Sequence, residues 1–155
     1  MTPGPAGIRP ATRDDLPRLW DIRHRNDVAG EPDPPAQGPL PPYLPHLLET
    51  ADLRVAEREG VVLGYAASVA RGGVTYVNDL FIEPRAQSGG LGAALLRAVL
   101  PPSGAPCCVL ASTDFRALAL YARSGMAPAW PNFELAAASA AIALYGGPGD
   151  WVEAD

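Results

Sequence analysis

The chain alternates between two spacings of apolar residues, one typical of strands and one typical of helices. Runs rich in β-branched and aromatic residues cover 53–57, 61–70 and 74–82, as expected for strands. Arg58-Glu59-Gly60 and Arg71-Gly72-Gly73 separate these runs, and short turns of this kind join neighbouring antiparallel strands. The pattern therefore predicts a three-stranded antiparallel meander.

Helical spacing follows this meander. Leu91, Leu95 and Val99 share one face of a helix expected over 93–100, and Pro101-Pro102 follows it. Proline cannot continue a helix, so the helix should end there. A run of strands followed by a helix predicts an α/β fold of the α+β type, and the length of 155 residues fits a single domain over 1–155.

The remaining elements are shorter. Seven prolines between 32 and 45 exclude a continuous helix through that stretch. Residues 146–155 are expected to form a loose tail. We also expect a first strand over 8–12, a helix capped by Thr12, a helix over 43–50, a buried strand over 107–110, a helix from a cap at 112–114 to about 123, and a last strand over 140–145.

Composition narrows the possible functions. No apolar run approaches the ~20 residues that cross a bilayer, and the N-terminus lacks a signal pattern, so a cytoplasmic protein is expected. Two cysteines and two histidines leave little for a metal site, and none is predicted. The net charge of −5 argues against a nucleic-acid partner.

A glycine-rich turn joins the strand over 76–82 to the helix that follows. Backbone N–H groups converge at such a helix start and favour a phosphate ligand. A Walker loop is excluded because it needs a lysine and all twelve basic residues are arginine. A dinucleotide fingerprint fits poorly because Leu95 stands where its third glycine or alanine is required.

Two motifs together carry a family resemblance. Gln87-Ser88-Gly89-Gly90-Leu91-Gly92 matches Gln/Arg-x-x-Gly-x-Gly/Ala, which resembles the coenzyme A pyrophosphate loop of the GCN5-related N-acetyltransferases, the GNAT family. Asp114-x-x-Ala117-x-x-x-Tyr121-x-x-x-Gly125-Met126 resembles that family's Asn-x-x-Ala-x-x-x-Tyr-x-x-x-Gly-Phe. Both occur in the expected order across 8–126.

The resemblance implies a mixed, mostly antiparallel central sheet flanked by helices. It also implies transfer of an acetyl group from acetyl-CoA to a primary amine by direct attack, with Tyr121 as the acid that protonates the departing thiolate. A backbone N–H near Ile82 would polarise the thioester carbonyl. The residues expected to bind the cofactor are Leu80, Phe81 and Ile82 along the pantetheine arm, Gln87, Ser88, Gly89, Gly90, Leu91, Gly92 and Ala93 at the pyrophosphate, and Asp114.

The general base is less well marked. Residues 107–111 contain no glutamate, which some family members carry there, so Asp79 is the best candidate. Strand alternation predicts that Asp79 shares a face with Val77 and Phe81. A salt bridge between Asp79 and an arginine is the competing interpretation, Glu83 is a lesser candidate expected to be exposed, and a water relay would also suffice.

Three departures from the family pattern leave other functions open. Gln87 stands where many members have arginine, Asp114 stands where asparagine is usual, and the strand glutamate is missing. These departures favour, as an alternative to an enzyme, a noncatalytic acyl-CoA-binding or regulatory domain. A second alternative is an interaction module that uses the fold only as a scaffold. If the protein is an enzyme, its acceptor is a small amine or a peptide or protein amine, and the family's frequent dimers allow a homodimer.

Overall fold

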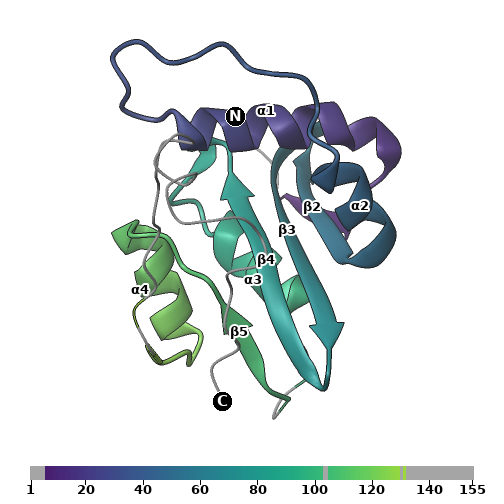
Figure 1. The fold of residues 1–155 in the computed structure, drawn as a ribbon, viewed down its shortest axis with the longest axis vertical. Helices are drawn as coiled ribbons and strands as arrows, with labels where there is room; N and C mark the ends of the chain where they lie inside the picture. The colour runs from purple at the N-terminus through teal and green to yellow at the C-terminus, as the bar shows by residue number, and fades with distance from the viewer. Residues whose placement is uncertain (1–5, 103–104, 130, 132–155) are drawn as a thin grey trace, which may run out of the picture.

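The computed structural model describes residues 6–102, 105–129 and 131, and its centre is one five-stranded sheet (Figure 1). The strands lie in the order in which they occur in the sequence. Neighbours pair antiparallel except for the last two, which pair parallel, so the sheet is mostly antiparallel as expected. The strands are β1 (Gly7–Pro10), β2 (Asp52–Arg58), β3 (Val61–Arg71), β4 (Val74–Ile82) and β5 (Cys107–Val109).

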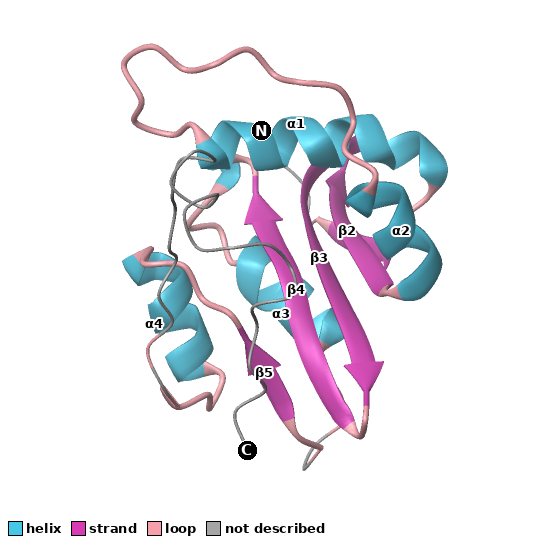
Figure 2. Ribbon diagram, viewed as in Figure 1, coloured by secondary structure: helices cyan, strands magenta, loops and turns pink. Residues whose placement is uncertain are grey.

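Helices cover both faces of the sheet. Figure 2 shows α1 (Leu16–Asp27) and α2 (Tyr43–Thr50) in front of it and α3 (Leu91–Val99) behind it. A fourth helix, α4 (Phe115–Arg123), lies beside β5. Two short 3₁₀ turns, Arg13–Asp15 and Pro84–Ala86, precede α1 and follow β4. Within the described ranges, no helix is long and apolar enough to span a bilayer.

The core has a layer on each face of the sheet. On the front, the fully buried side chains of α1 and α2 pack on β2 and β3 around Tyr65. On the back, Leu91, Leu95 and Val99 of α3 pack on Ala56 and Ala66, which confirms the helical face expected from their spacing. The helix begins at Leu91, two residues earlier than expected, because Gly90 adopts φ 81 and serves as its N-cap.

Several expected boundaries move by a few residues for local reasons. The first strand ends at Pro10 because the Thr12 amide donates to the Asp15 carboxylate (2.7 Å) and starts the next turn. The strand at Cys107 was expected to be buried, but Cys108 is exposed. In the described part of the chain β5 pairs with β4 alone. The strand expected over 140–145 and the tail over 146–155 lie outside the described residues.

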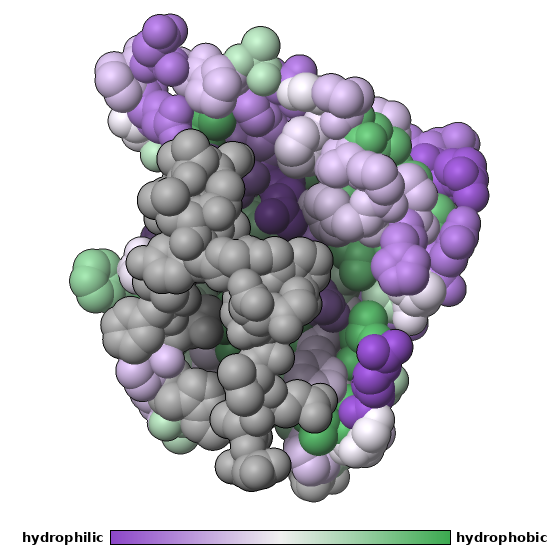
Figure 3. Space-filling model, in the orientation of Figure 1, coloured by the Kyte–Doolittle hydropathy of each residue, from purple (hydrophilic) through white to green (hydrophobic). Residues whose placement is uncertain are grey.

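The segment between α1 and α2 is irregular, as its prolines require. Residues 29–40 are exposed, and the Trp20 indole fastens the segment to α1 by donating to the Gly38 carbonyl oxygen (2.8 Å). In Figure 3 hydrophilic residues gather on this segment and on α1, while apolar and polar residues are interspersed over the rest of the described part of that face.

A β-bulge interrupts β4 at Asn78. Asp79 pairs with Ala67 and Val77 pairs with the adjacent Ser68, so Asn78 is an extra residue in the strand. An extra residue reverses the alternation of side chains on either side of it. Val77 therefore packs on the back of the sheet with α3 and α4, whereas Asp79 lies on the front. The expectation that Val77 and Asp79 share a face is wrong for this reason.

Candidate active site

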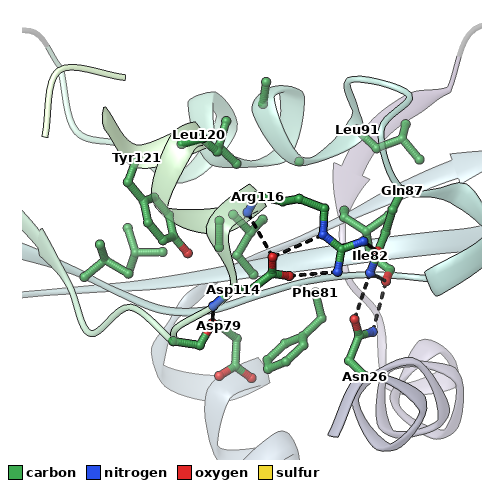
Figure 4. A pocket seen from close by; sticks show the side chains of 18 of the residues that line it. Asn26, Asp79, Phe81, Ile82, Gln87, Leu91, Asp114, Arg116, Leu120 and Tyr121 are labelled. Carbon is green, nitrogen blue, oxygen red and sulfur yellow. Dashed lines mark hydrogen bonds and ion pairs between the residues drawn. The ribbon is translucent and has the colours of Figure 1, made fainter. Parts of the chain in front are cut away.

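A cleft of about 830 Å³ opens where β4 and β5 separate. The two strands pair only from Thr75 to Val77 on β4. Beyond the bulge, β3 is the one described strand that pairs with β4, so the other edge of β4 is free. The free edge of β4, the turn before α3 and one side of α4 line this cleft (Figure 4). The pairing of β4 with β5 thus ends at the bulge, and the cleft begins there.

The free edge of β4 presents backbone donors to the cleft. Glu83 donates its N–H to the Leu63 carbonyl oxygen (2.8 Å), so the Glu83 amide points toward β3. Backbone groups of a strand alternate between its two edges, so the N–H groups of Leu80 and Ile82 point toward the cleft and that of Phe81 toward β3. An extended ligand arm can therefore pair with Leu80 and Ile82 as an added strand would.

The glycine turn supplies a second group of donors. The first helical bond of α3 runs from the Ala94 amide to the Gly90 carbonyl oxygen (3.1 Å), which leaves the amides of residues 91–93 outside the helical ladder. Ser88 and Gly90 both have positive φ, 65° and 81°, and this backbone shapes the turn. A Cβ on Gly92 would lie 3.3 Å from Leu120 Cδ2, so glycine there allows α4 to approach closely.

Gln87 ties the start of this turn to the rest of the site. Its side-chain nitrogen donates to Asn26 Oδ1 (3.0 Å) and to the Ile82 carbonyl oxygen (3.3 Å). Asn26 in turn donates to the same carbonyl (2.9 Å). Both amide hydrogens of Gln87 therefore have protein acceptors, and the side-chain oxygen accepts from Arg116 Nη1 (2.5 Å).

Asp114 begins α4 and holds Arg116. Its Oδ1 accepts from the Arg116 amide (2.9 Å), which confirms the expected helix cap. The same carboxylate accepts from Arg116 Nε (3.1 Å) and Nη2 (2.9 Å), and these side-chain bonds are the main reason that the pKa of Asp114 is lowered. Arg116 is not among the site residues expected from the sequence. Its position in the first turn of the helix, two residues after the capping aspartate, is the signal that could have identified it.

Tyr121 lies on the opposite wall of the cleft. Its ring packs on Val77 and Leu96 and is only 9% exposed, while its hydroxyl points toward β4 (Figure 4). A Schellman motif ends the helix that carries it, because the amides of Gly125 and Met126 donate to the carbonyls of Ala122 and Tyr121 (both 3.1 Å). Burial raises the pKa of Tyr121, so the phenol stays protonated at neutral pH.

Asp79 lines the cleft from the other side of β4 and is 7% exposed. Its Oδ2 accepts from the Tyr65 hydroxyl (3.1 Å), and its Oδ1 lies 3.5 Å from Arg23 Nη1. Burial raises the pKa of Asp79 and is the largest influence on it, while Arg23 and Tyr65 act in the opposite direction. The structure thus contains the salt bridge between Asp79 and an arginine, Arg23, that is the competing interpretation of Asp79.

Glu83 differs from its expected exposure. Only 7% of it is accessible, because two arginines of α1 reach it across the end of β4. Arg18 Nη2 lies 2.7 Å from Oε2 and Arg25 Nη1 lies 3.4 Å from Oε1. Glu83 thus fastens α1 to the sheet, and this pairing argues against its use as a base.

Solved structures share this fold at low sequence identity. An aminoglycoside N-acetyltransferase, AAC(6′)-Iy in complex with CoA, is 16% identical with a TM-score of 0.66, covering 88% of this chain and 98% of that one. The ribosomal-protein-S18-alanine N-acetyltransferase of Escherichia coli is 19% identical with a TM-score of 0.56, covering 77% and 76%. A transcriptional regulator from Bacillus halodurans is 17% identical with a TM-score of 0.66, covering 84% and 99%.

Family membership comes from the sequence itself. No curated protein sequence matches the chain. The model of the acetyltransferase (GNAT) family matches residues 16–126, well over half of the 155 residues. That match includes the glycine turn, the free edge of β4 and Tyr121. The chain therefore belongs to the GNAT family, whose members use acetyl-CoA.

Proposed function

We propose that this protein is an N-acetyltransferase that transfers the acetyl group of acetyl-CoA to a primary amine. One observation carries the proposal: a single cleft joins the spare amides of the glycine turn, the free edge of β4 and the Tyr121 hydroxyl. These three features supply an anion site, a binding edge and a proton donor. The expected cytoplasmic location would provide the acetyl donor.

The cofactor would lie along the cleft from the glycine turn to Tyr121. Its pyrophosphate would accept hydrogen bonds from the amides of residues 91–93, where the helix dipole also favours negative charge. Its pantetheine arm would run along the free edge of β4 and pair with the Ile82 N–H, which lies beside the glycine turn. Family resemblance extends the proposed binding set to Phe81, Gln87, Ser88, Gly89, Gly90 and Asp114.

The transfer would need few protein groups. The amine nitrogen forms a bond to the acetyl carbon, and the bond between that carbon and sulfur breaks. The Leu80 N–H, rather than the N–H near Ile82 expected from the sequence, would stabilise the charge that develops on the carbonyl oxygen, because Leu80 packs in the cluster that contains Tyr121 whereas Ile82 lies at the glycine turn. Tyr121 would give its proton to the leaving thiolate and regain one from solvent.

The proton released by the amine needs a separate route. Both oxygens of Asp79 already face partners, Tyr65 and Arg23, which makes Asp79 a poor direct base. We propose that water carries the proton away and that Asp79 positions Arg23 and contributes negative charge near the incoming ammonium. A direct base role for Asp79 is the competing proposal, and substitution of Asp79 by asparagine distinguishes the two.

Acetyl-CoA turnover with a panel of amines tests the proposal. The panel should hold both small amines and peptides, since the acceptors in the titles of the similar structures are of both kinds. Release of the CoA thiol above the rate of hydrolysis without an amine would support it. A protein that binds acetyl-CoA but transfers acetyl to no amine would favour the alternative, a noncatalytic acyl-CoA-binding domain, which the engaged amide of Gln87 also suits.

A further inference from the structure

The glycine turn of this chain contains no cation of its own. Residues 87–93 are polar, glycine or apolar, and no charged side chain lies among them. A pyrophosphate bears two negative charges near neutral pH, and helix amides alone supply only partial charges. Of the arginines in the described ranges, Arg116 and Arg123 line the cleft.

Arg116 faces the start of the glycine turn from across the cleft. Asp114 binds its Nε and Nη2 as a fork, which sets the plane of the guanidinium. The third nitrogen, Nη1, reaches the side-chain oxygen of Gln87 (Figure 4). A cation is thus already oriented at the point where the turn begins, and a neutral oxygen accepts its outermost hydrogen bond.

We propose that Arg116 binds the pyrophosphate of the acyl-CoA and supplies the positive charge that many family members carry at the position of Gln87. On binding, a phosphate oxygen would replace Gln87 Oε1 as the acceptor for Nη1. Asp114 is then a positioning residue for Arg116, and this explains an aspartate where the family usually has asparagine. The inference rests on the proposed function, because it assumes that the cleft binds acyl-CoA.

The test is calorimetric titration of coenzyme A into wild type and Arg116→Gln. Loss of one oriented charge from a pyrophosphate site should raise Kd about tenfold. Arg54→Gln is the matched control, because Arg54 also forms a partly exposed ion pair with an aspartate two residues away, Asp52 (2.5 Å), but lies on β2 away from the cleft. Its Kd should stay within about twofold of wild type.

Dephospho-coenzyme A, which lacks the 3′-phosphate, identifies the phosphate involved. The pyrophosphate assignment predicts the same factor for Arg116→Gln with both ligands. A loss that vanishes with dephospho-coenzyme A would assign Arg116 to the 3′-phosphate and overturn the proposal, as would a Kd for coenzyme A unchanged by Arg116→Gln. No binding by wild type would instead overturn the proposed function and this inference with it.

Asp114→Asn tests the positioning role by the sign of its effect. Asparagine keeps the helix cap but removes the negative charge that orients Arg116. If Asp114 positions Arg116, Asp114→Asn should weaken coenzyme A binding when Arg116 is present. The same substitution should have no such effect in the Arg116→Gln background. If Asp114 merely repels phosphate, the variant should tighten binding in both backgrounds, and this result would contradict the positioning role.

Discussion

Removal of one oxygen atom, by Tyr121→Phe, should slow turnover strongly while leaving the cofactor bound. The ring is packed on Val77 and Leu96, and phenylalanine preserves this packing. The hydroxyl points into the cleft, so its loss should change the free energy of unfolding by less than about 1 kcal/mol. A positioned acid contributes about 10²–10⁴-fold to a rate. Kcat should fall by at least about 100-fold, which corresponds to about 2.7 kcal/mol of barrier.

The assay measures kcat by thiol release and Kd for acetyl-CoA by calorimetry. Tyr76→Phe is the control, because it also removes a tyrosine hydroxyl, but Tyr76 lies on β4, is 43% exposed and is not among the residues that line the cleft. Since burial raises the pKa of Tyr121, wild-type turnover should not fall through loss of this proton until the pH exceeds about 10. Turnover by Tyr121→Phe equal to that of wild type would remove Tyr121 from the mechanism.

Three further predictions concern Asp79 in the cleft and two positions that stabilise the fold. Asp79→Asn should lower kcat by less than about tenfold if Asp79 only positions Arg23, whereas a direct base would require a loss of about 100-fold or more in the same thiol assay. Arg9 lowers the pKa of Asp15 from 3.8 to about 2, so this carboxylate stabilises the fold above pH 3.8 and ceases to do so as pH falls toward 2. In urea unfolding, the free energy of unfolding should fall by about 1 kcal/mol between pH 3.8 and pH 2. In Asp15→Asn this part of the pH dependence should be absent. In Gly64→Ala the new Cβ would lie 2.8 Å from the carbonyl oxygen of Phe81, and calorimetric melting should show a loss of about 1–3 kcal/mol.

Local patterns in the sequence were sufficient for most of the fold. The hairpin between β2 and β3 follows from Glu59 and Gly60, which both adopt positive φ (52° and 77°) as a two-residue turn requires. The sequence likewise predicts that Asp114 caps the start of α4 and that Gly125 ends this helix. These features depend on residues close in sequence, and therefore the pattern predicts them.

The rest depends on contacts between distant segments. Nothing in the sequence marks Asn78 as a bulge, because the bulge arises from how β4 registers against β3, and it decides which way Asp79 faces. Glu83 is buried because arginines from α1, 58 and 65 residues away, converge on it. Arg116 gains its relevance only when α4 packs across the cleft from Gln87.

The most direct test of the central claim is calorimetric titration of the purified protein with acetyl-CoA, with free coenzyme A as the control. The geometry of the glycine turn and of the free edge of β4 predicts saturable binding of both ligands in the micromolar range. No heat of binding at millimolar acetyl-CoA would contradict the account, since the cleft would then not be a coenzyme A site.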